Sequence, residues 1–378
     1  MTPVATHPTM RDVAALAGAS LKTVSRVING DPTVGTELAA RVRSAARKLD
    51  YRPNRIASDL ARKRTSAATG KPSTIGLLIQ DVSNEFSASI FRAVEDVAEA
   101  HGVTVLASNV NDDPGRERAL TANLVARRVD GLILVPAGQD HGYLAREQRS
   151  GVPVVFVDRP PLFLRADSVL SDNEAGACRG VSHLVEHGHQ RIAFLGEVSR
   201  FVPARLRHTG YTEALRQAGL PCDENLVRRD LWTEQDASDA VSEVMVVPDP
   251  PTALFAAHNR LTVGAIRGLR LLGLERSVAL VGFDDFGRAD LLQPAITVVA
   301  QDPGALGRLA AEILFRRIVG EDFPIAEHIV PTRLIVRGSG ELRPAGVTQG
   351  SHGTSSRGRR TPASNGSAEL RNHPDVAH

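Results

Sequence analysis

The chain has 378 residues, of which 42% are hydrophobic and 23% are charged, and its formal net charge is +2. Length and composition allow a small head and two larger lobes, and no stretch is long and apolar enough to span a membrane. Residues 1–9 lack the basic and apolar regions of a signal peptide, so we expect a cytoplasmic protein without a membrane partner. The cysteines, Cys178 and Cys222, fit a reducing compartment without disulfides.

Three short helices are predicted near the N-terminus, over residues 10–17, 21–29 and 37–49. Gly18 breaks the first helix, and Ser20 can cap the second. The apolar residues predicted to face the interior are Val13, Leu16, Ala17, Val24, Val27, Ile28, Val42, Ala45, Ala46 and Leu49. Polar and basic side chains remain on the outer face of the second helix, as in a helix-turn-helix.

The alternative is that this head is an ordinary three-helix bundle with a solvated polar face, and the charge distribution argues against it. Residues 10–64 carry twelve Lys or Arg and five Asp or Glu, a net charge of +7, whereas residues 65–342 carry a net charge of −8. A basic end on an acidic body predicts that the head binds phosphates.

The head resembles the LacI/GalR family of bacterial transcription regulators, and the resemblance continues to about residue 340. The matching strings are DVA at 12–14, AG at 17–18, TVSRVIN at 23–29, Val34, YRPN at 51–54 and ASDL at 57–60. The resemblance implies a repressor that binds a near-palindromic operator in double-stranded DNA as a homodimer. It also implies control by a small-molecule effector, a sugar or sugar derivative, and association with the nucleoid when DNA is bound. A regulator of the same fold that is controlled by a protein partner, or that lacks an effector, stays open.

Within this family, the DNA-contacting positions of this chain are Leu21, Lys22, Thr23, Ser25, Arg26, Asn29, Arg55, Ala57 and Leu60. Arg26 is the candidate for direct readout, since a guanidinium can bind guanine O6 and N7. Residues 54–60 match the family's hinge helix. There Leu60 is the position that enters the minor groove as a wedge; the alternative is that Leu60 packs on the head. Val34 could pack in the core or contact DNA.

Departures from the family pattern occur at Gly35 and at Leu38-Ala39, where phosphate-contacting residues are usual. Residues 61–74 form a linker of fourteen residues, about twice the usual length. Its Ser, Thr, Gly and Ala content predicts flexibility and weaker coupling between head and body.

Beyond the linker, short apolar strands alternate with amphipathic helices. The predicted strands are 75–79, 103–107, 131–135, 154–157, 192–195, 253–256 and 278–283, and the predicted helices are 86–101, 115–127, 176–187, 206–218 and 261–272. This alternation predicts an α/β fold with parallel sheets covered on both faces. Together with the resemblance, it predicts an all-α helix-turn-helix head followed by a two-lobed, periplasmic-binding-protein-like core.

The predicted boundaries follow from this scheme. The ranges are 1–60 for the head with its hinge helix, 61–74 for the linker, 75–342 for the effector-binding and dimerisation core, and 343–378 for a disordered tail. Within the core, lobe 1 is expected at about 75–172 and 302–331, and lobe 2 at about 173–301 and 332–342.

The effector is expected between the lobes, at the carboxyl ends of the strands. The candidate residues are Phe86, Asp158, Asp172, Arg207, Trp232, His258, Asn259 and Asp284. Arg207 and Asp284 match ligand-binding positions of the family, and the guanidinium suits hydroxyl pairs or a carboxylate. Trp232 matches an aromatic that stacks on the ligand, with burial in the core as the alternative. His258-Asn259 stands where the family usually has Asn-Asp.

Catalytic motifs are lacking, and neither a catalytic residue nor a cofactor is predicted. His183, His187 and His189 resemble a metal cluster at first sight. The family has a helix end at this place, and a His that interacts with the helix dipole explains the spacing better, so no metal site is predicted.

Overall fold

The protein was analysed as a computed structural model that describes residues 8–28, 31, 33–51 and 72–344. The predicted hinge helix and several candidate DNA contacts lie outside these residues, namely Asn29, Arg55, Ala57 and Leu60. Most of the predicted linker and of the C-terminal tail also lies outside them.

The head contains the three expected helices, which are α1 (Met10–Ala17), α2 (Leu21–Ile28) and α3 (Thr36–Lys48). Their shared core is built on fully buried Val13, Val24 and Val42. Gly18 ends α1 in the left-handed conformation at φ 58°, and the Oγ of Ser20 accepts the Thr23 N–H at 3.1 Å. The break and the cap read from the sequence are therefore confirmed.

One side chain of the head core was predicted wrongly. Leu16 is 52% exposed, and Ala14 takes the inward position instead. On a helix of only eight residues the buried stripe is narrow. If the predicted stripe is shifted by one position, an exposed large side chain is therefore assigned to the core. Val34 packs against the core of the head, which favours the packing alternative.

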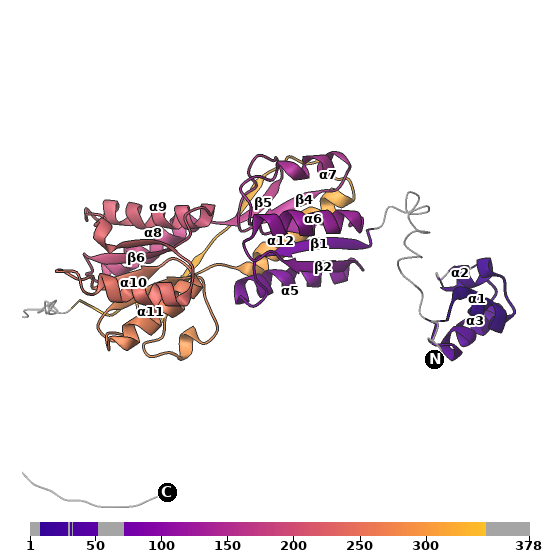
Figure 1. Ribbon diagram of the computed structural model, residues 1–378, viewed down its shortest axis with the longest axis horizontal. Coiled ribbons are helices and arrows are strands. Elements are labelled where there is room, and N and C mark those ends of the chain that lie inside the picture. Colours follow the sequence, from indigo (N-terminus) through magenta and orange to yellow (C-terminus); the bar gives the residue numbers. More distant parts are fainter. Residues whose placement is uncertain (1–7, 29–30, 32, 52–71, 345–378) are drawn as a thin grey trace, which may run out of the picture.

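The body consists of two lobes, each a six-stranded sheet with helices on both faces (Figure 1). In lobe 1 the strand order is β11-β5-β4-β3-β1-β2, and all five pairings are parallel. Its strands are β1 (Thr74–Ile79), β2 (Thr104–Asn109), β3 (Leu132–Leu134), β4 (Val154–Val157), β5 (Asp167–Ser171) and β11 (Glu327–Val330). Its helices are α5 (Glu85–Ala100), α6 (Pro114–Ala126), α7 (Ala145–Arg149) and α12 (Pro303–Ile318), with a 3-10 turn at Gly142–Leu144.

Lobe 2 repeats this plan with the strand order β12-β10-β9-β8-β6-β7, in which only the β10–β12 pair is antiparallel. Its strands are β6 (Ile192–Glu197), β7 (Val227–Leu231), β8 (Ala253–Ala256), β9 (Ala279–Phe283), β10 (Thr297–Ala300) and β12 (Arg333–Ile335). Its helices are α8 (Asn173–Glu186), α9 (Val202–Gln217), α10 (Glu234–Val244) and α11 (Asn259–Leu271), with 3-10 turns at Glu224–Leu226 and Ala289–Leu291.

Each sheet is buried on both faces, which explains its apolar strands. In β1, Leu77 packs under α5 and α12, whereas Leu78 packs under α6. In lobe 2, α10 and α11 cover one face of the sheet, and α8 and α9 cover the other.

The chain crosses between the lobes three times, after β5, after β10 and after β11. The crossovers place β11 and α12 in lobe 1, although β9 and β10 before them belong to lobe 2. The exact lobe boundaries stay a prediction, and the linker must end before Thr74, where β1 begins.

Five strands escaped the sequence analysis: β5, β7, β10, β11 and β12. They are three to five residues long, and β5 begins with Asp167 while β7 contains Arg228, Arg229 and Asp230. Polar residues interrupt the apolar signal in β5, β7, β11 and β12, on which the prediction rested. The strand β10 is apolar apart from Thr297 and was overlooked. No helix of the described residues is long and apolar enough to cross a membrane.

Close helix packing in lobe 2 depends on glycine. A Cβ at Gly264 of α11 would lie 2.2 Å from the carbonyl oxygen of Glu234 in α10, where backbone cannot yield. We expect Gly264→Ala to lower the free energy of unfolding by about 1–3 kcal/mol through overpacking. Urea denaturation followed by circular dichroism measures the loss. The control is Gly304→Ala in α12, where the nearest atom would lie 3.4 Å from the new Cβ; equal losses for both variants would contradict the packing argument.

Candidate functional site

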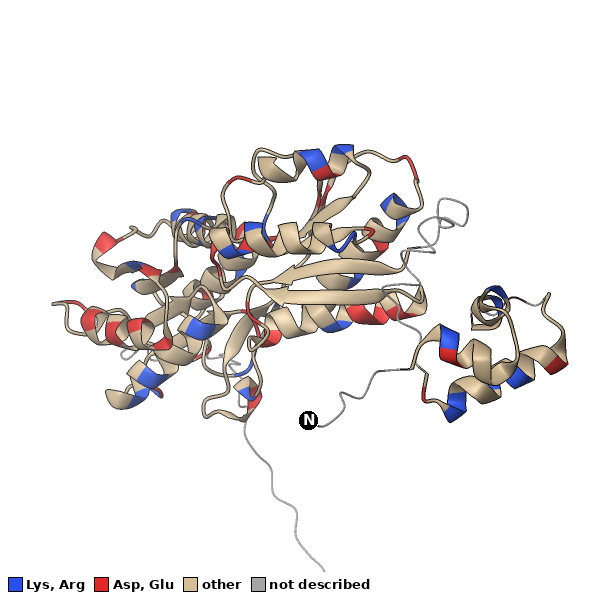
Figure 2. Ribbon diagram, turned by 45° about the vertical axis from the view of Figure 1, so that its right-hand side comes forward, with Lys and Arg blue, Asp and Glu red and all other residues tan. Residues whose placement is uncertain are grey.

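Helix α2 presents the predicted DNA-reading face of the head. Val24 and Val27 are buried in the core, whereas Leu21 and Lys22 at its N-terminal end are exposed. Thr23, Ser25 and Arg26 are half-buried beside them. Lys and Arg residues are spread along the helices of the head (Figure 2). An exposed N-terminal end on the second helix is the geometry with which a helix-turn-helix enters the major groove.

Arg26 is held by the turn that follows α2. Its Nε donates to Asp31 Oδ2 at 2.8 Å, and its guanidinium also contacts Thr33 Oγ1. The hydrogen bond from Arg26 holds the pKa of Asp31 well below its usual range, so the carboxylate stays charged. Because the Arg26 side chain is 43% exposed, water weakens this pair. Arg26 can therefore exchange Asp31 for a base at modest cost.

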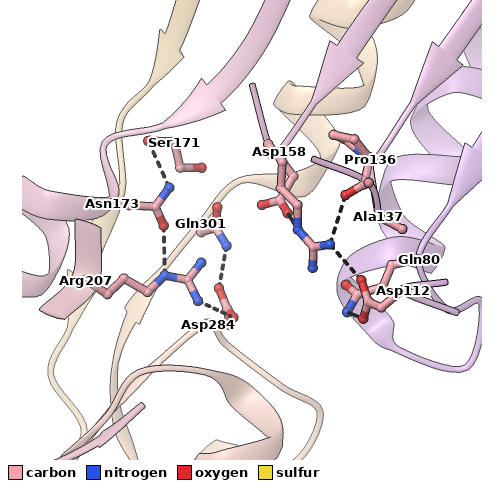
Figure 3. Close-up of polar contacts among 12 residues, drawn as sticks. Gln80, Asp112, Pro136, Ala137, Asp158, Ser171, Asn173, Arg207, Asp284 and Gln301 are labelled. Carbon is pink, nitrogen blue, oxygen red and sulfur yellow. Dashed lines mark hydrogen bonds and ion pairs between the residues drawn. The ribbon is translucent and has the colours of Figure 1, made fainter. Parts of the chain in front are cut away.

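The second candidate site lies between the lobes, where polar side chains follow the carboxyl ends of the strands (Figure 3). Asp158 follows β4 in lobe 1, and Asp284 follows β9 in lobe 2. Both have left-handed backbone, at φ 69° and 71°. In each lobe the amide of this Asp donates to the neighbouring strand at 2.9 Å, to Val169 O and to Val299 O. The two aspartates thus occupy equivalent places in the two sheets.

Arg207 of α9 is the polar centre of lobe 2 and is 2% exposed. Its Nε donates to Asn173 Oδ1 at 2.8 Å, and one terminal nitrogen donates to Ala257 O at 2.8 Å and lies 3.6 Å from Asp284 Oδ2. The guanidinium lies over the ring of Phe283, 3.9 Å from its centroid. The structure therefore brings Arg207 and Asp284 together, as a shared site requires.

Arg159 is the corresponding centre of lobe 1, and the sequence analysis missed it. It is 5% exposed, donates to Asp112 Oδ1 at 2.6 Å and to Pro136 O at 3.0 Å, and lies 3.6 Å from Asp158. Phe201 of lobe 2 covers its guanidinium at 3.6 Å. Its place directly after an apolar strand is the same signal that selected Asp158.

Asp158 is strained electrostatically. The pKa of Asp158 is raised to about 6, chiefly by burial; Arg159 and Arg207 oppose the rise, and Asp284 and Glu197 add to it. Glu197, at the end of β6, is a second residue that the sequence analysis missed. A ligand that donates hydrogen bonds to Asp158 would therefore offset the cost of burying its charge.

His258 and Asn259, the altered family positions, cap α11 and join the lobes. His258 Nδ1 accepts the Arg260 N–H at 3.2 Å, and burial lowers the pKa of the imidazole, so it is neutral with its proton on Nε2. The Asn259 amide exchanges two 3.3 Å hydrogen bonds with Asn84 of lobe 1. This exchange needs an amide on both sides, which the acidic residue usual in the family could not provide.

Trp232 lies beside this region and is 39% exposed, which excludes burial in the core. Arg200 stands 5.7 Å from its ring and donates to Asp112 O of lobe 1 at 2.8 Å. Gln139 of lobe 1 donates to Arg200 O at 2.9 Å. Arg200 is thus a bridge between the lobes that the sequence did not reveal.

Two other candidates have structural partners. Asp172 accepts the Thr332 N–H at 2.6 Å and Arg179 at 3.0 Å, so its carboxylate joins two crossovers. Phe86 packs against the core of lobe 1. For both, a role in effector binding stays a prediction.

Two buried polar atoms near the site have no hydrogen-bond partner among the described residues. They are Ser171 Oγ, on a side chain at the end of β5, and Gln301 Oε1, whose amide nitrogen donates to Asp284 Oδ1 at 2.5 Å. A buried polar atom without a partner is costly, so these atoms are available to a ligand. Neither residue was predicted.

The described residues include no group of three His, Cys, Asp or Glu that could hold a metal ion. Each histidine of the 183–189 cluster has another partner. His183 pairs with Glu341, His187 Nδ1 lies 2.8 Å from His183 O, and His189 Nε2 lies 2.6 Å from Leu342 O.

Comparison with known proteins identifies two families of domains in the chain. Residues 9–54 match bacterial regulatory proteins of the lacI family, and residues 181–340 match the periplasmic binding protein-like domain. Catabolite control protein A of Priestia megaterium is 30% identical over 88% of this chain and 98% of its own length. The ribose operon repressor of Escherichia coli K12 is 31% identical over 82% and 93%. The crystal structure of the lac repressor dimer bound to operator and an anti-inducer covers 89% of this chain and 99% of its own, at 28% identity and a TM-score of 0.77.

The raised pKa of Asp158 predicts a pH-dependent effect on stability. A carboxyl that is harder to ionise in the folded state destabilises the fold above its folded pKa, near 6, and this cost disappears as pH falls toward 4. We expect Asp158→Asn to raise the free energy of unfolding by about 1–3 kcal/mol at pH 7.5 and by roughly a third of that amount at pH 4.5. Urea unfolding of both proteins at both pH values measures the difference in the free energy of unfolding. Asp249→Asn, at an exposed site, is the control; a difference for Asp158→Asn that is independent of pH would contradict the assignment.

Proposed function

The chain belongs to the lacI family of bacterial regulatory proteins, and we propose that it represses transcription by binding a near-palindromic operator as a homodimer under the control of a sugar-like effector. One combination of features carries the proposal. A basic helix-turn-helix head precedes two lobes whose facing strand ends hold buried polar groups, some of which have no hydrogen-bond partner among the described residues. A DNA-binding function places the protein in the cytoplasm, at the nucleoid, and we infer no catalytic activity because its relatives are transcriptional regulators.

The head supplies DNA binding in this proposal. Leu21, Lys22 and Arg26 read bases in the major groove, and Thr23, Ser25 and Asn29 contact the backbone. In the hinge segment, Arg55 contacts a phosphate or the minor groove, Ala57 also contacts DNA, and Leu60 enters the minor groove as a wedge. A dimer supports this arrangement because two heads related by a two-fold axis match two inverted half-sites.

The lobes supply the response. Arg207, Asp284 and Gln301 offer donors and acceptors from lobe 2, and Asp158 offers acceptors from lobe 1. Trp232 offers a half-exposed aromatic face, which suits the apolar face of a sugar. A ligand that touches both lobes stabilises one relative placement of the lobes over others, and the operator affinity changes with it.

Selection from random DNA with the purified full chain tests DNA binding. We expect an enriched sequence with two inverted half-sites, and Arg26→Ala should weaken binding about 5- to 150-fold and relax the preference at one base pair of each half-site. Fluorescence anisotropy at fixed salt measures the affinity. Asp31→Asn removes the partner of Arg26 but not the guanidinium, so this control keeps the base preference. Failure to enrich any sequence would contradict the proposal.

A panel of monosaccharides that includes D-ribose tests the response. Trp232 is the only tryptophan of the chain, so its emission reports ligand near the site. We expect a bound sugar to change both this emission and the operator affinity. Arg207→Lys, which loses the fork that holds Asn173 and Ala257, should bind the sugar at least tenfold more weakly. Arg205→Lys, exposed on the same helix, serves as the control. If no sugar alters either signal, control by a protein partner or the lack of an effector is favoured.

A further inference from the structure

A cavity of about 550 Å³, here called the side pocket, opens beside the polar site and is lined by both lobes. Lobe 1 contributes the end of β5 and the edge strand β11, and lobe 2 contributes α8 and α9. Asp158 and Asn173 border it, but Arg207, Trp232 and Asp284 are not part of its lining. The side pocket is therefore distinct from the centre of the proposed effector site.

The lining of the side pocket carries one sign of charge. It contains the five carboxylates of Asp158, Asp172, Glu174, Glu213 and Glu327, and its described residues include no Lys, Arg or His. Arg179 and Arg216, outside the lining, balance Asp172 and Glu213. Arg159 lies 3.6 Å from Asp158, so the exposed carboxylates of Glu174 and Glu327 leave a local negative charge at the pocket.

The walls are apolar. Leu170, Val202, Pro203, Leu206 and Ile329 face the pocket, and Ile329 is 51% exposed although it lies in a strand. An exposed apolar strand residue beside a hollow of this size gives a hydrocarbon or aromatic body a surface to cover.

Ser171 is an independent sign of a ligand. The residue lines the pocket and is 4% exposed, yet its hydroxyl oxygen has no hydrogen-bond partner among the described residues. Because a buried hydroxyl without a partner costs free energy, the fold retains here a group that a ligand with a hydrogen-bond donor can satisfy.

We propose that the side pocket binds an organic amine with an apolar body, such as an arylalkyl amine. The ammonium group is attracted by Glu174 and Glu327 and donates to Ser171 Oγ, and the body lies on Leu206 and Ile329. Two other classes of ligand fit less well. An anion is repelled by the carboxylates, and a neutral polyol does not cover the apolar walls, which stay in contact with water. Since the amine touches β5 and β11 of one lobe and α8 and α9 of the other, its binding depends on the relative placement of the lobes. The proposal requires neither DNA nor a sugar.

Cys178 lines the pocket and provides a direct reporter, since the only other cysteine is Cys222. In the full chain carrying Cys222→Ser, the rate of Cys178 alkylation by N-ethylmaleimide is followed by mass spectrometry. The probes are 2-phenylethylamine, the uncharged 2-phenylethanol and the anion 3-phenylpropanoate, at matched ionic strength. We expect the amine to slow alkylation at least tenfold in a saturable manner, and the other two to have little effect.

Substitutions test the charge. Glu174→Gln combined with Glu327→Gln should raise the half-protecting amine concentration about five- to tenfold, because two attractions are lost. Glu186→Gln, exposed at the far end of α8, should leave it unchanged. Circular dichroism verifies that each variant is folded. Equal protection by amine and alcohol, protection unaffected by the double substitution, or absence of protection by the amine would each overturn the proposal.

Discussion

The geometry of the space between the lobes depends on the contacts of one buried guanidinium at the strand ends of each lobe. An arginine cannot lose its proton, so Arg159 and Arg207 remain charged and require partners wherever they are buried. Arg159 gathers the segments that follow β2, β3 and β4, through Asp112, Pro136 and Asp158. Arg207 gathers the start of α8 and the ends of β8 and β9. Loops that would otherwise vary independently are thereby fixed in one geometry.

The carboxylates of this network occupy backbone conformations that few residues tolerate. Asp112, Asp158 and Asp284 all have positive φ, which aspartate accepts more readily than most residues because its short side chain bonds locally. Asp158 and Asp284 occupy equivalent places, so the same strand-end arrangement of an aspartate occurs once in each sheet. The guanidinium is supplied differently, by the second residue after β4 in lobe 1 and by helix α9 in lobe 2. The strand-end aspartate therefore follows from the repeated fold, whereas each arginine is specific to its lobe.

Sequence reasoning succeeded where one element carries its own signal. The spacing of Val24 and Val27 predicted α2, and Ser20 predicted its cap. The apolar runs predicted the central strands of both sheets. It failed where the signal is shared between distant segments. Arg179 and Asp172 both bond to Thr332, which lies about 160 positions further along the chain. The roles of Glu197, Arg200 and Gln301 likewise depend on partners in other elements, which their local sequence does not indicate. Arg207 and Asp284 were found through family resemblance, and nothing in their local sequence shows that they meet.

The lobes are joined by bonds that are individually weak. The Asn84–Asn259 amide pair, the bond from Arg200 to Asp112 O and the bond from the Gly287 amide to Glu85 Oε2 cross the space between them. Net values of about 0.5–1.5 kcal/mol for each such bond add to a few kcal/mol. Reversing a two-state equilibrium from 1:99 to 99:1 takes about 5.5 kcal/mol of differential binding, which is the same order. The bridges are thus strong enough to define one placement of the lobes and weak enough for a small molecule to change it. A fully buried ion pair across the same space would have made that change far more costly. The buried ion pairs Arg159–Asp112 and Arg207–Asp284 each lie within one lobe. In the crossing bonds, by contrast, the charged groups of Arg200 and Glu85 bond to neutral backbone groups of the other lobe, and the Asn84–Asn259 pair is neutral on both sides.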